Sequence, residues 1–183
     1  PYAVAPTRVN EFDYPEGDLN VYTPYRGSGG LPIGHWLQRA AAATYLLEPR
    51  LLTAGSIDPT SKLLIRREVR QRVHAIAPFL DLRGDPYLIS IPDPVDPAIG
   101  SEQHQYWVVE GFTHSSTYPY SAAVSSNDSD RYLRNSVKAV VDAYNGSVQL
   151  YISEPDDPLI QGWARVFPQL FQTLEQMPSS IRD

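Results

Sequence analysis

The clearest alternation of apolar and polar positions runs from Val137 to Glu154, where two alternating stretches flank Asn145-Gly146. Alternation with a period of two is typical of a half-buried β-strand, and Asn-Gly is strongly favoured in two-residue hairpin turns. With this turn, six apolar side chains share one face in the pairs Ala143–Val148, Val141–Leu150 and Ala139–Ile152. The other face would be mostly polar, with the pairs Asp142–Gln149, Lys138–Ser153 and Val140–Tyr151. The pattern therefore predicts an antiparallel hairpin with one fixed register.

Apolar residues at helical spacing predict two helices in the first half of the chain. One covers 35–47 and ends at Glu48-Pro49. The other covers 61–77, with Asp58 as its N-cap, Pro59 in its first turn and Pro78 as its end. Its apolar stripe would consist of Ile65, Val69, Val73 and Ile76.

The second half of the chain predicts strands over 87–91 and 105–112, with loops at 92–100 and 125–130. A last helix would be capped by Asp156 or Asp157 and begin at Pro158. Its buried face would consist of Ile160, Trp163, Val166 and Phe167. This order predicts an α+β fold, with an antiparallel sheet of about four strands, including the hairpin at 137–154, packed with helices. We expect residues 1–183 to form a single soluble domain.

The composition of the chain excludes several kinds of binding site and reactive group. The net charge of −6 and the sequence pI near 5.1 argue against nucleic-acid binding, which usually requires a basic face. The chain has no cysteine, so disulfides, zinc–thiolate sites, iron–sulfur clusters and thiol nucleophiles are excluded. The sequence also has no phosphate-binding P-loop, and we expect no cofactor.

Three basic residues four positions apart, Lys62, Arg66 and Arg70, would form one line on the helix predicted over 61–77. In an acidic protein this line is a candidate surface for anionic lipid headgroups, a charged polymer or an acidic partner. The alternative, which we favour, is a solvated helix face paired with nearby carboxylates.

Aromatic side chains suggest a candidate groove for a carbohydrate or a peptide, because rings combine a large contact area with a polar handle. The candidates in the predicted strand and the following loop are Tyr106, Trp107, Tyr118 and Tyr120. The alternative, again favoured, is an aromatic core on a half-buried sheet.

Catalytic and metal-binding patterns are weak. His114 is followed by Ser115, but neighbours on a strand point to opposite faces, so this pair does not predict a base beside a nucleophile. Asn127, Asp128 and Asp130 lack the ligand pattern of a calcium loop. We therefore predict no catalytic and no metal-ligating residues.

Several segments resemble an uncharacterised bacterial family of multi-pass membrane proteins with a large soluble extracytoplasmic region. They cover residues 11–15, 72–80, 85–88, 132–144 and 154–158, and the stretch from Arg134 to Ser147 is the most specific. The resemblance implies that the chain, which starts at Pro1, is a fragment of that region from a longer protein. No catalytic or binding residues follow from it.

The leading hypothesis is a non-catalytic structural or interaction domain, extracytoplasmic in a protein of the cell membrane, with protein or membrane partners. One alternative is a binding module for cell-envelope glycans or anionic polymers. Another is an enzyme whose site is completed outside this fragment, with Glu110, Asp142 or His114 lining a cleft. The sequence does not specify a small-molecule ligand.

Overall fold

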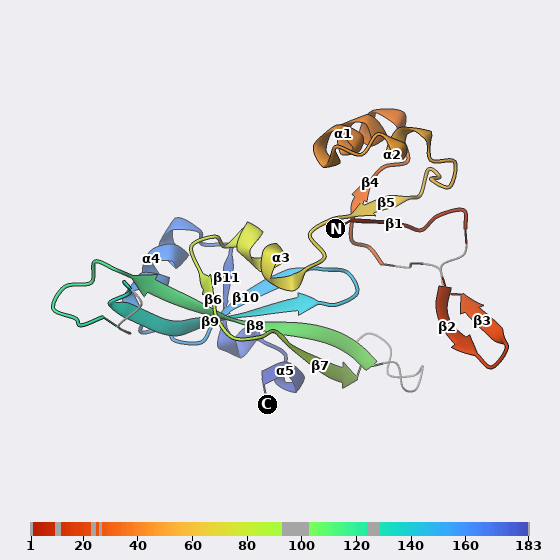
Figure 1. Cartoon of the computed structure of the whole chain (residues 1–183). Helices are drawn as coiled ribbons and strands as arrows, with labels where there is room; N and C mark the ends of the chain where they lie inside the picture. The colour runs from red at the N-terminus through yellow and green to blue at the C-terminus, as the bar shows by residue number, and fades with distance from the viewer. Residues whose placement is uncertain are drawn as a thin grey trace. The chain divides into compact units, whose positions relative to one another are not determined.

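The computed structural model describes residues 2–9, 12–22, 25, 27–92, 103–123 and 129–182 (Figure 1). The chain divides into two compact units, residues 1–67 and 68–183. The predicted α+β class is confirmed, because the described residues contain five α-helices and several mostly antiparallel sheets. That residues 1–183 act as a single domain stays a prediction.

The first unit combines short strands with two helices. Strands β1 (Ala3–Ala5), β5 (Lys62–Leu64) and β4 (Leu31–Pro32) form an antiparallel sheet in that order, and β2 (Phe12–Glu16) pairs with β3 (Leu19–Tyr22). Helices α1 (Trp36–Leu46) and α2 (Arg50–Thr53) enclose a core with Ile33, Ile57 and Leu63. The helix predicted over 35–47 is confirmed. It starts at a capping box between His35 and Gln38 and ends at Leu47, which has left-handed backbone angles.

The helix predicted over 61–77 is wrong in its first half. Residues 62–64 form β5, and helix α3 covers only Val69–Ile76. The carboxylate of Asp58 does accept hydrogen bonds, from the amide and hydroxyl of Thr60, but it caps a turn before β5 and no helix. Arg66 has a positive φ of 51°, which ends regular structure, and the Glu68 side chain caps α3 instead.

The second unit contains a six-stranded sheet in the order β11-β10-β9-β8-β6, with β7 also paired to β8. Its strands are β6 (Asp81–Leu82), β7 (Tyr87–Pro92), β8 (Gln103–Ser115), β9 (Tyr132–Asp142), β10 (Val148–Ile152) and β11 (Phe171–Thr173). The strands predicted over 87–91 and 105–112 are confirmed. The predicted strand number was too low, because β6 and β11 are too short to leave a periodic pattern. Neighbours are antiparallel except β10 and β11, so the sheet is mixed. Residues 93–100 and 125–128 of the predicted loops lie outside the described residues.

The predicted hairpin forms, but its register differs from the prediction by two residues. Val148 lies opposite Val141, and Leu150 lies opposite Ala139. The cause is Asp142, whose carboxylate accepts the amides of residues 144 and 145 at 2.7 and 2.8 Å and so turns the chain early. The loop therefore spans 143–146, closed by a 2.9 Å hydrogen bond from the Asp142 amide to the Ser147 carbonyl. A shift by two leaves every side chain on its predicted face.

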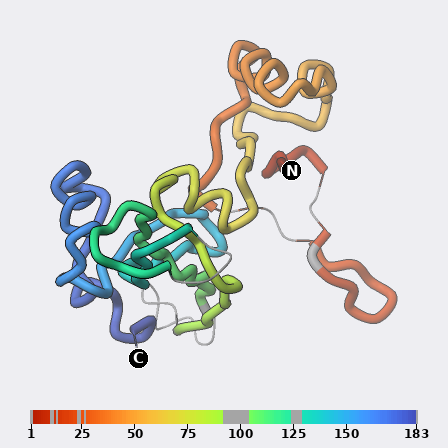
Figure 2. The backbone as a smooth tube through the Cα atoms, turned by 60° about the vertical axis from the view of Figure 1, so that its left-hand side comes forward, coloured from red at the N-terminus to blue at the C-terminus, as the bar shows by residue number. Residues whose placement is uncertain are grey.

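Both faces of this sheet are covered. In Figures 1 and 2, the strands lie between two helices, α3 and α4, and the C-terminal segment. One face packs against α3 and α4 (Pro158–Val166), with Val73, Leu150 and Ile160 in the core. The other face packs against the 3-10 helix η1 (Leu174–Gln176) and α5 (Ser179–Arg182), where Tyr151 contacts Met177. The prediction of a mostly polar second face was wrong around Tyr151, because the chain returns to cover it.

Alanine substitutions at two glycines of the second unit should change the stability of the chain in opposite directions. We expect Gly162→Ala to stabilise the chain by about 0.5–1 kcal/mol, because alanine favours a helix interior over glycine. A Cβ at Gly162, inside α4, meets nothing within 4 Å. Gly146→Ala should destabilise instead, because Gly146 has a φ of 71° and its Cβ would lie 2.7 Å from Arg72 Nη1. Urea unfolding of the 183-residue chain measures both changes, and a destabilising Gly162→Ala would contradict the placement of α4.

Candidate functional site

Helix α4 is held in place by a buried carboxylate at its first turn. Asp157, the N-cap of α4, is fully buried and accepts the amide of Leu159 at 3.0 Å. Its second carboxylate oxygen accepts the hydroxyls of Thr113 and Ser136, both at 2.5 Å, and the Tyr132 hydroxyl donates to the first. Ser136 is the extra residue of a β-bulge in β9, which turns its hydroxyl toward α4. The predicted cap at Asp157 and first turn at Pro158 are confirmed.

Hydrogen bonding decides the charge of this cluster. Burial disfavours the ionised form of Asp157, but the bonds from Ser136, Thr113, Tyr132 and the Leu159 amide outweigh it and lower the pKa of Asp157 below its usual value. Burial and the bond to Asp157 raise the pKa of Tyr132 to about 12. Tyr132 therefore stays a proton donor at neutral pH, and the cluster is a structural anchor for α4.

One turn beyond the buried Ile160, an aromatic stack joins α4 to the turn that follows α3. The rings of Phe79 and Trp163 lie 4.1 Å apart, centroid to centroid, at an angle of 15°. Phe167 continues the stack, with its ring 5.9 Å from Phe79 and 6.1 Å from Trp163. Nearly parallel rings form a flat, stiff apolar wall.

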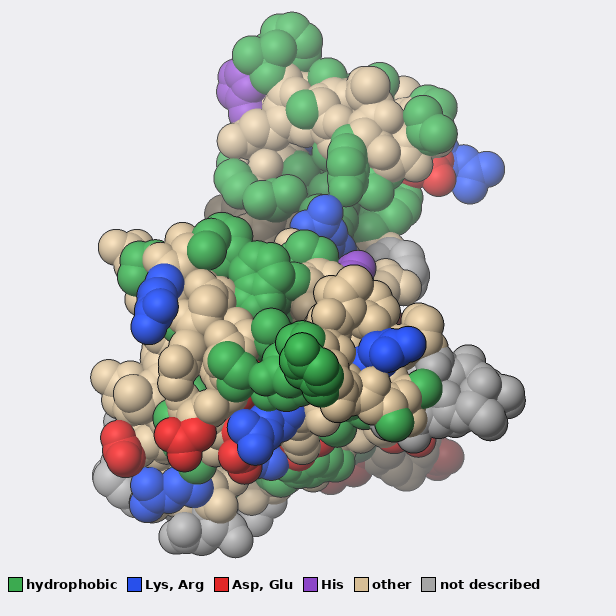
Figure 3. All heavy atoms as spheres, turned by 90° about the vertical axis from the view of Figure 1, so that its left-hand side faces the viewer, with side chains coloured by type: hydrophobic (Ala, Val, Ile, Leu, Met, Phe, Trp, Pro, Cys, Tyr) green, Lys and Arg blue, Asp and Glu red, His purple; other side chains and the backbone are tan. Residues whose placement is uncertain are grey.

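This wall borders an apolar groove with a volume of about 740 Å³. Its lining comes from the end of α3 and the next turn (Ile76, Pro78 and Phe79) and from the end of α4 and the next turn (163 and 166–170). Val166 is 62% exposed, Phe167 43% and Ile76 41%, so the groove is open to solvent. Figure 3 shows hydrophobic side chains gathered on the face of this unit that carries α4. We name this feature the α3–α4 groove.

The sequence analysis missed the groove because it took one apolar stripe as one buried face. Ile160 is buried and Trp163 is partly buried as predicted, but Val166 and Phe167 were wrongly assigned to the core. These two side chains instead line the open groove. The signal in the sequence is that the stripe continues to the Phe167-Pro168 turn, where the helix ends.

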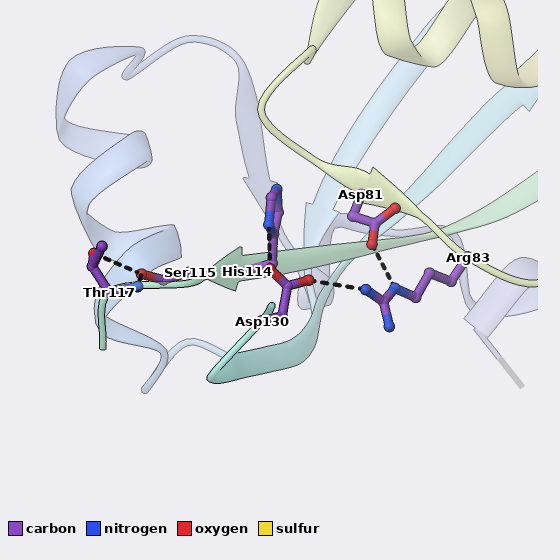
Figure 4. A network of polar contacts seen from close by, with 6 residues as sticks. All are labelled: Asp81, Arg83, His114, Ser115, Thr117 and Asp130. Atoms are coloured by element: carbon purple, nitrogen blue, oxygen red, sulfur yellow. Dashed lines mark hydrogen bonds and ion pairs between the residues drawn. The ribbon is translucent and has the colours of Figure 1, made fainter. Parts of the chain in front are cut away.

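A polar network at the ends of β8 and β9 involves several predicted site residues (Figure 4). Asp130 lies between His114 and Arg83, 3.3 Å from His114 Nδ1 and 3.0 Å from Arg83 Nη2, and Arg83 also pairs with Asp81. The hydroxyl of Ser115 points away from His114 and bonds to Thr117. The network ties strand ends together and does not align a base with a nucleophile.

The other acid candidates are also engaged in strand pairing. Glu110 lies opposite Lys138 in the β8–β9 register, and their charged atoms are 2.8 Å apart. Asp142 pairs with His104 at 3.1 Å. Within the described residues, no group of three or more His, Cys, Asp or Glu side chains is placed to hold a metal ion. Asn127 and Asp128 of the predicted acidic cluster lie outside the described residues.

The basic line predicted for Lys62, Arg66 and Arg70 does not form, because no helix contains all three. Lys62 lies in β5, where its Nζ donates to the carbonyls of Gly27 and Ser28 at 3.0 and 3.1 Å. Arg66 precedes α3 in the first unit, and Arg70 lies in α3 of the second unit, 3.0 Å from Asp85.

The four predicted groove aromatics are likewise not brought together. Trp107 packs on the sheet face that carries α3 and α4, whereas Tyr106 packs on the opposite face. Tyr118 stacks on Tyr132 with ring centroids 4.6 Å apart, and Tyr120 is fully exposed. Adjacent strand residues such as Tyr106 and Trp107 cannot line the same groove.

The described structure defines the chain as an α+β polypeptide whose second unit carries an open apolar groove. The chain belongs to the Uncharacterised protein family (UPF0182), whose family model matches residues 1–183. It is 86% identical over 183 residues to a UPF0182 protein of Parasynechococcus marenigrum (strain WH8102), and 44% identical over 182 residues to one of Nostoc sp. (strain PCC 7120 / SAG 25.82 / UTEX 2576). These alignments cover 100% and 99% of the chain but 21% and 18% of the relatives, so the chain spans about a fifth of their length.

No solved structure matches the chain. Among the helices of the described residues, none has the length and apolar character needed to cross a bilayer. The resemblance to an uncharacterised bacterial family is confirmed at the level of family membership.

Proposed function

We propose that this segment is a non-catalytic docking domain of a longer protein, and that the α3–α4 groove receives an apolar polypeptide segment. The observation that carries the proposal is the groove itself, where Val166, Phe167 and Ile76 remain exposed beside a stack of aromatic rings. Exposed apolar surface of this kind is typical of interaction sites, and aromatic rings supply much of the binding free energy at such sites.

The groove is formed before a partner arrives. Asp157 fixes the start of α4 through four hydrogen bonds, and Ile160 anchors its next turn in the core. A site on such a supported element loses little conformational entropy on binding, which favours affinity. The groove therefore suits a rigid docking role.

We further propose that the domain lies outside the cytoplasm as part of a protein of the cell membrane. The support is the family resemblance described above, which implies such a topology. Protease added to cells whose outer envelope has been made permeable should cleave this segment in the full-length protein. Complete protection from protease in cells with a permeable outer envelope would refute the proposed location.

Hydroxyl-radical footprinting tests the docking function. We expect Trp163 and Phe167 to be oxidised several-fold more slowly in the full-length protein than in the 183-residue chain, because an occupant excludes water from the rings. Mass spectrometry of both digests measures the rates. Tyr120, which is fully exposed and distant in sequence from the groove, serves as the control ring. Equal oxidation of Trp163 in both samples would contradict a docking role.

A further inference from the structure

We infer that the occupant of the α3–α4 groove is an amphipathic, acidic segment of the same polypeptide, from the part that lies outside these 183 residues. This inference rests on the proposed docking function and specifies the partner. Three properties of the described residues support it: the charge of the groove walls, the shape of the groove, and the fraction of the full-length protein that the chain represents.

The two stretches that form the groove walls contain no acidic residue. Neither 69–80 nor 158–174 includes Asp or Glu, although the whole chain has 21 acidic residues against 15 Lys and Arg. Arg165, in the last turn of α4 and next to the lining residue Val166, is exposed and carries a positive charge. In Figure 3, the acidic side chains in view on this unit lie in its lower part, below the hydrophobic patch at its centre. The groove therefore favours a partner with negative charge beside its apolar anchors.

The helix ends do not cancel this preference. Helices α3 and α4 both end at the groove, and a helix C-terminus carries a partial negative charge of about half a unit. The Arg165 side chain in the last turn of α4 carries a full positive charge, about twice the partial charge at the end of that helix. Arg165 therefore sets the sign of the groove rim near α4.

The shape of the groove suits a short helix. Its lining comes from two segments, the end of α3 with the next turn and the end of α4 with the next turn. A helix with apolar residues three and four positions apart can place them against two such segments, as in other helix-in-groove complexes. Its acidic residues would then face the rim that carries Arg165.

The same polypeptide is a better source for this helix than a second copy. The chain spans about a fifth of its relatives, so most of the polypeptide lies outside it. A tethered segment has a high effective concentration at the groove, which a separate molecule lacks. A two-fold dimer through this surface would bring the basic rim against an identical basic rim.

Site-specific photo-crosslinking in the full-length protein tests the inference. The photoreactive residue p-benzoylphenylalanine replaces Val166 in the groove, and replaces the fully exposed Tyr120 as the matched control. After irradiation, we expect several-fold more product at Val166 than at Tyr120, at the mobility of the monomer. Peptide mass spectrometry should identify an Asp- and Glu-containing apolar segment outside the 183 residues. Arg165→Glu should reduce this product several-fold, and Arg165→Lys should retain it.

The alternative outcomes separate the inference from the proposed function. A crosslinked dimer or a crosslink to another protein would overturn the intramolecular occupant but support docking. A lipid adduct, or no product above the Tyr120 control, would overturn both. An intramolecular product that is basic in sequence, or insensitive to Arg165→Glu, would overturn the acidic character of the occupant. Footprinting of Trp163 in each variant shows whether the groove has kept its fold.

Discussion

Asp157→Ala should destabilise the 183-residue chain by about 3–5 kcal/mol, among the largest effects of any single substitution. The carboxylate is fully buried and accepts hydrogen bonds from Thr113, Ser136, Tyr132 and the Leu159 amide. Its removal leaves buried hydroxyls without their acceptor and also removes the cap of α4. Equilibrium unfolding in urea measures the loss as a lower midpoint.

The matched control is the neighbouring residue. Asp156→Ala removes the same carboxylate from an exposed position, and it should change the free energy of unfolding by less than about 0.5 kcal/mol. Similar losses for the two variants would show that Asp157 is not the anchor of α4.

The buried carboxylate of Asp157 also determines the direction in which the stability of the chain changes with pH. The pKa of Asp157 is lowered in the folded chain, so its stabilising contribution is present above the usual aspartate pKa of 3.8 and is lost as the pH falls toward the folded value. The pKa of Asp142 is lowered in the same direction, because hydrogen bonds from residues 144 and 145 and from His104 outweigh the opposing effect of burial. The urea midpoint of unfolding should therefore decrease as the pH is lowered from about 5 to about 3. The Asp157→Asn variant should show a smaller decrease over the same range.

Tyr151→Ala should cost about 3–5 kcal/mol, because it removes a large buried side chain and leaves a cavity. Tyr151 is 1% exposed, and it packs with Val108, Val140 and Met177 on the sheet face covered by η1 and α5. Urea unfolding again measures the change.

Tyr120→Ala makes the same chemical change at a fully exposed position and should be nearly neutral. A small effect for Tyr151→Ala would restore the prediction of a polar outer face and contradict the packing of the C-terminal segment over the sheet. A loss comparable to that of a core substitution would show that both sheet faces contribute to stability.

Local pattern predicted the hairpin faces but not the register. Alternation fixes which side chains share a face, so Ala139, Val141 and Leu150 were correctly assigned. The register depends on the loop, and a single side chain, Asp142, replaced the expected Asn-Gly turn by capping two amides. The sequence pair Asn145-Gly146 is compatible with both loops, so pattern alone could not distinguish them.

The wrong half of the helix prediction over 61–77 illustrates a second limit of local sequence patterns. The apolar stripe that predicted this helix begins at Ile65, yet pairing of residues 62–64 with β1 and β4 buries Leu63 and selects a strand before it. The pairing strands β1 and β4 are distant in sequence from residues 62–64, so a short window of sequence cannot predict this strand. The α3–α4 groove was missed for a related reason, since the exposure of Val166 and Phe167 depends on which parts of the fold pack against the end of α4, and the helical pattern does not contain that information.

The strand lengths in the second unit have a consequence for self-association. The sheet is longest at its centre, where β8 and β9 lie, whereas one edge is β11, of three residues, and the other is shared by β6, of two residues, and β7, of six. Short edge strands offer few unpaired backbone groups to a strand from another chain, which protects a sheet from edge-to-edge aggregation. Strand addition from another chain is therefore disfavoured at β11 and β6, and the longer edge strand β7 ends at Pro92, which has no backbone amide to donate.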